Sequence, residues 1–240
     1  MVPQFPQKGR LPVKENRKGV HYFDHAADRS ERWYRSHFPR QRVRSATGEA
    51  HTVTGEATPW YLFAPGAAER AAGVLPEAKL LAVLRNPVDR AHSHFLEQRR
   101  RGHEPLATFG DALEAEPQRC REGLVDAHGR RRSAAFAREH LTYTLQGEYD
   151  RGISTWLEHF DRDSLLVLRS EDVFANAPAE LARVASFLGL ADFVFRAERR
   201  NATSGADPDA DSARRLARHY APGVARLEAM LNQPMGWDLS

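Results

Sequence analysis

Residues 79–95 (KLLAVLRNPVDRAHSHF) constrain the fold of this chain more than any other segment does. The apolar run Leu80–Leu84 is short and continuous, which is typical of a strand that a parallel sheet buries on both faces. Asn86 can cap a helix, and Pro87 suits the first helical position because its missing N–H breaks no hydrogen bond there. The segment therefore predicts a strand, a charged turn and a helix.

The turn between this strand and helix has the chemistry of an anion site. Ligands of open α/β sheets bind outside the carboxyl ends of the strands, and helix N-termini attract anions. Arg85 offers a planar fork of donors at this point, and Ser93 adds a hydroxyl group from the helix. Val88, Ala91 and Phe95 recur at helical spacing and are expected to face the sheet. An ordinary turn with a solvated arginine is the alternative interpretation.

Strands and helices alternate in the rest of the chain. Residues 165–168 form a second apolar strand, and the apolar positions within 153–160 recur as on one face of a helix. Pro178 is placed to begin a helix and Gly189 to end it, whereas Pro222 is expected to break the last helical segment. The predicted class is α/β with a mainly parallel sheet of about three or four strands.

Length and composition indicate one domain. A chain of 240 residues with 41% hydrophobic content can bury a sizeable core. Residues 1–17, rich in proline and basic side chains, read as an extended basic arm before a single domain over 18–240. Residues 99–140 are the least interpretable part, and we expect a surface insertion or a lid over an acceptor pocket there.

The single cysteine, Cys120, excludes an internal disulfide framework and favours a reducing, cytoplasmic setting. No apolar run approaches the roughly 18 residues of a membrane span, and the first residues lack the apolar core of a signal peptide. The abundance of alanine and arginine suggests a bacterial source.

The charge of the chain favours a small anionic ligand. A net charge of +3 and a pI of about 9.2 are a mild basic excess. A nucleic-acid binder using residues 99–101 and 130–132 is an alternative, but the chain has no nucleic-acid motif, so we expect no nucleic-acid partner.

The central segment also resembles a known family. Arg85, Asn86, Pro87, Asp89, Arg90 and Ser93 match, position by position, the 3′-phosphate-binding segment of sulfotransferases that use 3′-phosphoadenosine-5′-phosphosulfate (PAPS). Blocks at 18–24, 33–39, 55–62 and 156–190 resemble the carbohydrate-type sulfotransferases, the group that includes heparan sulfate sulfotransferases and bacterial relatives. The resemblance covers residues 18–237 and implies a P-loop-NTPase-like sulfotransferase fold, in which helices flank a parallel sheet.

The resemblance implies transfer of a sulfuryl group from PAPS, without a metal, to a hydroxyl or amine of a carbohydrate or small-molecule acceptor. Arg85 and Ser93 would then bind the 3′-phosphate of the nucleotide. Arg200 and Asn201, in the polar segment 199–212, would complete the nucleotide-binding residues.

The catalytic residues implied by the resemblance lie near the start of the chain. Lys18 would face the sulfonate or the acceptor, His21 would act as the base, and Asp24 would orient His21. The family usually carries a glutamate as general base where this chain has Gly19, which cannot remove a proton. A neutral histidine can act as a base near pH 7, so His21 is the candidate that remains.

A second departure concerns the donor loop. The family begins with a central strand and a Gln-Lys-Gly-Gly-Thr-Thr loop around the 5′-phosphosulfate, of which only residues 7–9 (QKG) are echoed here. We therefore expect the sheet to lack its first central strand and turnover to be very low. The alternative function is a truncated or vestigial sulfotransferase that binds a 3′-phosphoadenosine nucleotide without efficient turnover.

Overall fold

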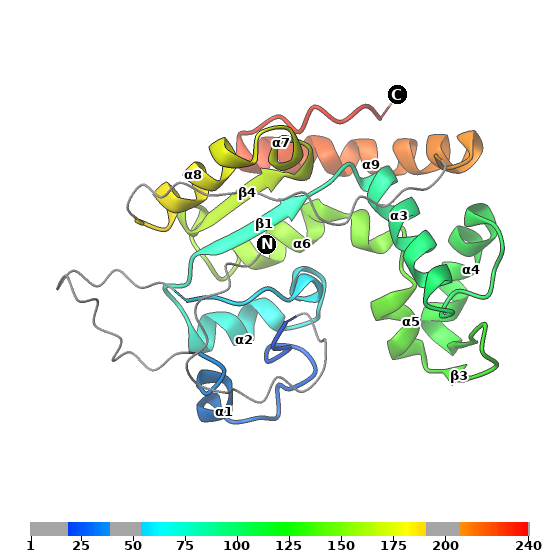
Figure 1. Ribbon diagram of the computed structural model, residues 1–240, viewed down its shortest axis with the longest axis horizontal. Coiled ribbons are helices and arrows are strands. Elements are labelled where there is room, and N and C mark those ends of the chain that lie inside the picture. Colours follow the sequence, from blue (N-terminus) through cyan, green and yellow to red (C-terminus); the bar gives the residue numbers. More distant parts are fainter. Residues whose placement is uncertain (1–18, 39–53, 191–206, 240) are drawn as a thin grey trace. The chain divides into compact units, whose positions relative to one another are not determined.

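A computed structural model describes residues 19–38, 54–190 and 207–239 of the chain (Figure 1). The chain forms two compact units that interleave along the sequence. The first unit contains residues 1–82 and 155–200, and the second contains 83–154 and 201–240. The boundaries pass through strand β1 (Leu80–Leu84) and helix α6 (Tyr149–Leu157). The single domain expected over 18–240 stays a prediction.

The first unit is built around an aromatic cluster. Its elements are α1 (Glu31–Arg35), the 3₁₀ turns η1 (Pro59–Leu62) and η3 (Arg162–Ser164), α2 (Ala67–Val74), β4 (Leu165–Arg169), α7 (Ser170–Ala175) and α8 (Ala177–Phe187). Rings of Tyr22, Phe23, Tyr34, Tyr61, Trp156 and Phe160 pack with small residues of α2. Tyr22 and Tyr34 stack with their ring centroids 4.5 Å apart. This cluster fixes the turn that follows Gly19.

Strands β1 and β4 form a two-stranded sheet and run parallel (Figure 1). The α/β class is thus confirmed, but the expectation of three or four parallel strands is wrong for the described residues. The second strand and the helix before it follow the predicted pattern, whereas the other apolar segments have helical periodicity and form helices. The gap expected from a missing central strand concerns residues 1–18, which lie outside the described residues.

Burial of β1 on both faces was also wrongly predicted. Leu80 packs against the aromatic cluster, whereas Leu81 and Val83 are 46% and 58% exposed. Successive side chains of a strand point to opposite faces, so only one face of β1 is covered.

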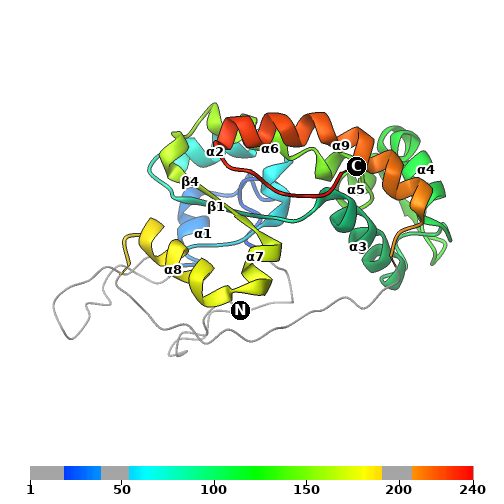
Figure 2. The ribbon, with the colours of Figure 1, turned by 90° about the horizontal axis from the view of Figure 1, so that it is seen from above.

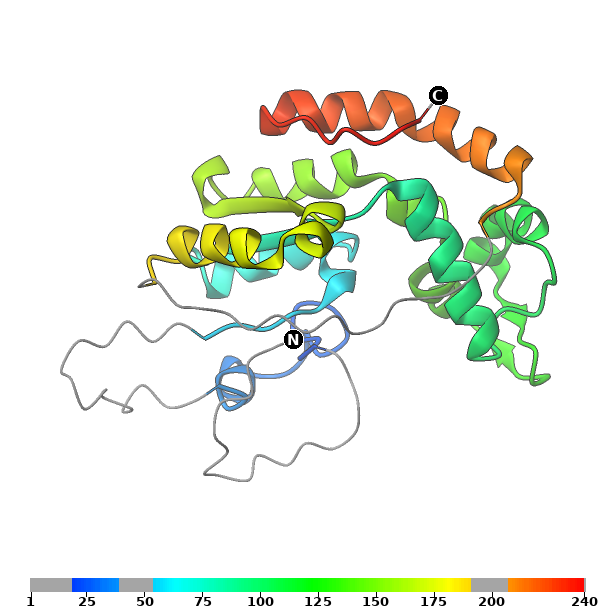
Figure 3. The same cartoon turned by 45° about the horizontal axis from the view of Figure 1, so that its top comes forward.

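The second unit is helical. It contains α3 (Pro87–Arg100), α4 (Phe109–Glu122), a small antiparallel hairpin of β2 (Leu124–Val125) and β3 (Arg131–Arg132), α5 (Ala134–His140), η2 (Leu145–Gly147) and α9 (Ala210–Leu231). Helix α3 packs against α4, α9 and η2. After α9 the chain turns at Asn232 and runs back beside the helix (Figures 2 and 3).

The predicted strand, turn and helix at residues 79–95 are confirmed. Asn86 caps α3, because its side-chain oxygen accepts hydrogen bonds from the N–H groups of Val88 (2.9 Å) and Asp89 (3.4 Å). Phe95 is buried as expected, but against the rings of Phe109 (5.4 Å) and Tyr143 (5.9 Å) rather than against the sheet.

The expected helix break at Pro222 is wrong. Helix α9 continues through Pro222, because residues on both sides of it are held by packing. The buried Tyr220 donates its hydroxyl to the carbonyl oxygens of Tyr143 (3.2 Å) and Thr144 (3.0 Å), and Gly223 lies directly against the carboxylate of Asp150. These contacts offset the backbone hydrogen bond that a proline cannot make.

Residues 99–140 form an ordered helical insertion. The buried carboxylate of Glu104 accepts two hydrogen bonds from Arg119 (2.6 and 2.9 Å) and one from the hydroxyl of Tyr143 (2.8 Å). Its action as a lid stays a prediction. Among the described residues, no helix is long and apolar enough to cross a membrane.

Candidate functional site

His21 and Asp24 form a hydrogen-bonded pair in the first unit. His21 Nδ1 lies 2.8 Å from Asp24 Oδ2, and the Asp24 side chain is 4% exposed against 21% for His21. An ionised carboxylate can only accept a hydrogen bond, so Nδ1 carries the proton and Nε2 has the lone pair. The structure therefore brings together two of the predicted catalytic residues in the geometry of an oriented base.

A carboxylate that the sequence interpretation missed holds this turn in place. Glu56 accepts hydrogen bonds from the backbone N–H of Val20 (3.0 Å) and the hydroxyls of Thr58 (2.9 Å) and Tyr61 (3.2 Å). Burial, with the Glu56 charge as a further cause, raises the pKa of Tyr34 and Tyr61 far above the ordinary value, so both phenols stay protonated donors. Glu56 stood inside a block used only for the family resemblance, and no role was assigned to it.

Gly19 occupies a position that admits no side chain. Its φ is +95°, in the region that favours glycine. A Cβ atom there would lie 2.2 Å from the hydroxyl oxygen of Thr58 and 2.9 Å from the carbonyl oxygen of Ala57. The absence of a carboxylate at residue 19 is thus built into the backbone of this turn.

Arg85 in the second unit lies at the carboxyl end of β1, as predicted. Its side chain is 42% exposed, and its only ion-pair contact among the described residues is a long one of 3.9 Å to Asp89. The backbone is better fixed than the guanidinium, because the hydroxyl of Tyr149 donates to the Arg85 carbonyl oxygen at 3.0 Å. The guanidinium therefore keeps donors for a ligand.

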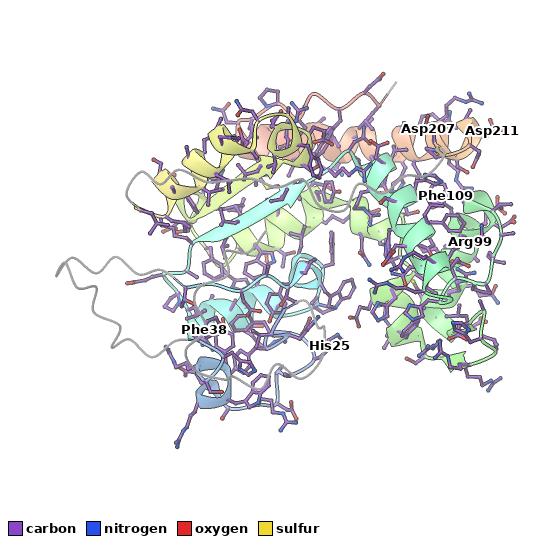
Figure 4. The ribbon with its side chains drawn as sticks, viewed as in Figure 1. His25, Phe38, Arg99, Phe109, Asp207 and Asp211 are labelled. Atoms are coloured by element: carbon purple, nitrogen blue, oxygen red, sulfur yellow. The ribbon has the colours of Figure 1, made fainter. Side chains whose placement is uncertain are left out.

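Ser93 is half-buried on α3, about 9 Å along the helix axis from Pro87. A cavity of about 300 Å³ opens beside the cap of α3, with Asn86, Asp89, Asp207 and Asp238 among its lining residues. Figure 4 labels Asp207 just before α9. These carboxylates suit hydroxyl or amine donors of a ligand better than its phosphate.

The remaining predicted site residues, Lys18, Arg200 and Asn201, lie outside the described residues. The described pairs belong to different units, His21 and Asp24 to the first and Arg85 and Ser93 to the second.

One group of side chains in the described ranges could hold a metal ion. His21, Asp24 and His25 each offer a ligand atom within 4.8 Å of the others, and His25 is labelled in Figure 4. The set overlaps the proposed base, and a function without a metal stays a prediction.

Comparison with known proteins gives concordant matches. The family described as "Sulfotransferase domain" matches residues 69–203. A solved sulfotransferase from Alicyclobacillus acidocaldarius is similar, with a TM-score of 0.65 and 30% identity, covering 85% of this chain and 72% of that one. This similarity also confirms the sulfotransferase fold.

Curated relatives include two heparan sulfate enzymes. The bifunctional heparan sulfate N-deacetylase/N-sulfotransferase 1 of Caenorhabditis elegans is 29% identical over 68% of this chain and 16% of its own length. The human heparan sulfate glucosamine 3-O-sulfotransferase 3B1 is 26% identical over 91% of this chain and 56% of its own length. The chain thus spans about half or less of the length of these relatives.

Proposed function

Because the chain belongs to the sulfotransferase family, we propose that it transfers a sulfuryl group from PAPS to a hydroxyl or amine of a carbohydrate or small-molecule acceptor. Relatives named as heparan sulfate sulfotransferases support a carbohydrate acceptor. The observation that carries the proposal is the pair of His21 and the buried Asp24, which can remove a proton from an acceptor.

The proposed reaction is an in-line displacement. The acceptor oxygen attacks the sulfur of PAPS while its proton moves to Nε2 of His21. The bond between sulfur and the bridging oxygen breaks, so a sulfate ester and adenosine 3′,5′-bisphosphate are the products. Asp24 holds the imidazole in the correct tautomer and stabilises the imidazolium that forms.

Nucleotide binding falls to the second unit in this proposal. Arg85 would make charge-assisted hydrogen bonds to the 3′-phosphate and Ser93 would add its hydroxyl. Arg200 and Asn201 would contact the nucleotide, and Lys18 the sulfonate or the acceptor. The proposal also includes action of residues 18–240 as one domain, with 99–140 bordering the acceptor site.

The first test concerns the base. With labelled PAPS and a panel of carbohydrate and amine acceptors, His21→Ala should lower kcat roughly 10²- to 10⁴-fold. Asp24→Asn should lower kcat and change the acidic limb of the pH–rate profile, because the imidazole loses its charged partner. His159→Ala, an exposed histidine of the first unit, is the matched control. Unaltered turnover in His21→Ala would refute the assigned base.

The second test concerns the nucleotide. Hydrogen bonds to charged groups contribute about 1.5–3 kcal/mol each, so Arg85→Ala should weaken binding of adenosine 3′,5′-bisphosphate at least about tenfold in calorimetric titration. Arg218→Ala, which removes an exposed arginine of α9, should leave the affinity unchanged. Nucleotide binding by the unmodified chain without transfer to any acceptor would favour the vestigial alternative.

A further inference from the structure

Two arginine triplets that are far apart in the sequence meet in the second unit. Arg99–Arg101 end helix α3, and Arg130–Arg132 follow the turn of the β2–β3 hairpin. The backbone N–H of Ala127 donates to the carbonyl oxygen of Gly102 at 3.1 Å, and His128 Nε2 lies 3.3 Å from the carbonyl oxygen of Arg101. We call these six arginines the arginine patch; Figure 4 labels Arg99 on α3.

The arginine patch is only partly neutralised. Glu97 pairs with Arg100 and Arg101, both at 2.7 Å. The fully buried carboxylate of Asp126 pairs with Arg130 (2.9 Å) and Arg132 (2.8 Å). Two carboxylates thus serve six guanidiniums.

Two members of the arginine patch keep their full charge. Arg99 and Arg131 are exposed and, within the described ranges, have no carboxylate at ion-pair distance. Arg99 donates to the carbonyl oxygen of Ala107 at 2.9 Å, which fixes its position without cancelling its charge. Burial, together with Arg132 and Arg101, lowers the pKa of His103, as expected inside a cationic field.

We propose that the arginine patch binds an anionic polysaccharide and so presents an acidic acceptor chain to the enzyme. The inference rests on the proposed function for the identity of the bound chain as acceptor. Guanidinium groups match the oxygens of sulfate and carboxylate in bidentate geometry, and several of them side by side suit a polymer with regularly repeated anions.

The surroundings of the patch favour a glycan over a nucleic acid. Proteins that bind single-stranded nucleic acids combine basic grooves with aromatic rings on which bases stack. Here the guanidinium of Arg132 lies over the ring of Phe136 at 4.5 Å, and Arg99 lies 5.8 Å from the ring of Phe95. Within the described part of the second unit, no large aromatic side chain is among the exposed ones.

Helix α3 connects the patch to the nucleotide turn. The cap of α3 lies beside Arg85 and its last turn carries Arg99 and Arg100. The 14 residues of α3 span about 21 Å along the helix axis. A bound oligosaccharide of several sugars can cover this length, so the patch is suited to long acceptors rather than single sugars.

Combined substitution of Arg99→Ser and Arg131→Ser in the full chain tests the proposal. Calorimetric titration with a heparin-derived oligosaccharide should show affinity reduced at least about fivefold, because two exposed charge contacts are lost. The dependence of affinity on salt should also become shallower, since fewer counterions are released. Arg131→Glu, a single change at an exposed hairpin position, provides a second variant, and melting temperatures show that each variant is folded.

The control changes the same charge elsewhere in the same unit. Arg215→Ser combined with Arg218→Ser on α9 should leave oligosaccharide binding unchanged, since neither residue belongs to the patch. Equal weakening by control and patch variants, or unchanged binding in the patch variants, would overturn the proposal. So would single-stranded DNA that binds as tightly as the oligosaccharide and is lost in the same variants.

Two further readouts separate this proposal from the proposed function. The patch variants should keep the affinity for adenosine 3′,5′-bisphosphate and the transfer to small acceptors, while transfer to long anionic chains falls. If the wild type binds the oligosaccharide through the patch but transfers no sulfuryl group to any acceptor, the patch stands and the proposed function fails. If transfer occurs but binding does not depend on the patch, the reverse holds.

Discussion

At the scale of single residues, the turn that carries the candidate base depends on a glycine and a buried network around one carboxylate. The backbone at Gly19 is left-handed, and the hydroxyl of Thr58 occupies the space where a side chain would begin. His21 itself has a positive φ of 56°. Glu56 anchors the adjacent N–H of Val20, so the strain of this turn is offset by fixed hydrogen bonds.

Gly19→Ala should destabilise the protein by more than about 1–2 kcal/mol, the cost of a left-handed residue with a Cβ atom, with the clash against Thr58 in addition. Urea unfolding measures the change. Gly55→Ala is the matched control, because nothing lies within 4 Å of a Cβ atom built at Gly55. Equal stability of the two variants would contradict this account of the turn.

Glu56→Ala should cost about 1–3 kcal/mol, because it leaves the Val20 N–H and two hydroxyls without their acceptor. Since the turn then holds His21 less firmly, kcat should fall while the affinity for adenosine 3′,5′-bisphosphate stays the same. Glu69→Ala on α2, an exposed carboxylate, is the control. A variant with full stability and full kcat would exclude Glu56 as a positioning residue.

At the scale of elements, the insertion between α3 and η2 is held by a buried ion pair. Glu104 has a fully buried side chain and Arg119 is 8% exposed. Neutralising one partner leaves the other charge buried and uncompensated, which costs more than the pair itself contributes. The insertion therefore has the interior of a folded domain.

Glu104→Gln should destabilise the protein by about 3–5 kcal/mol, whereas Tyr143→Phe, which removes one hydrogen bond to a charged group, should cost about 1.5–3 kcal/mol. Chemical unfolding gives both values. Glu114→Gln on α4, 72% exposed, should change stability by less than about 0.5 kcal/mol. If Glu104→Gln behaves like Glu114→Gln, the ion pair contributes nothing to the fold.

Local signals predicted the elements well, and long-range packing decided what they did not predict. The cap and the proline at residues 86–87 fix the start of α3, and Gly189 with its φ of 67° ends α8 as expected. The continuation of α9 through Pro222 depends on Tyr220 and its distant acceptors in the insertion, which no local pattern contains.

The candidate site follows the same division. The spacing of His21 and Asp24 was sufficient to pair them, because three residues separate them in one turn. Glu56 could not be found in this way, since its partner Val20 lies 36 residues away. The exposure of Leu81 and Val83 likewise depends on which elements cover the sheet, and an apolar run does not contain that information.

At the scale of the whole molecule, buried histidines make the stability depend on pH. Burial, together with the charge of Arg90, lowers the pKa of His94 from 6.5 to about 3. The unfolded chain therefore binds a proton at higher pH than the folded chain does. The free energy of unfolding from this group is complete above pH 6.5 and is lost as the pH falls toward 3.

His94→Gln should flatten the pH dependence of the free energy of unfolding between pH 6.5 and 5, by up to about 1.4 kcal/mol per pH unit. Urea titrations at several pH values measure the slope. Burial also lowers the pKa of His92 and His103, so part of the dependence should persist in the variant. His159→Gln should keep the wild-type slope, and an unchanged slope in His94→Gln would contradict the assignment.

The aromatic cluster of the first unit has a spectroscopic consequence. Of the four tryptophans, Trp33, Trp60 and Trp156 lie in or against this cluster, whereas Trp237 belongs to the second unit and packs beside Tyr149. Indole emission therefore reports mainly on the first unit, while the long helix α9 and the helices of the insertion place much of the circular dichroism signal in the second. Following one denaturation with both signals tells whether the two interleaved units melt as one cooperative body.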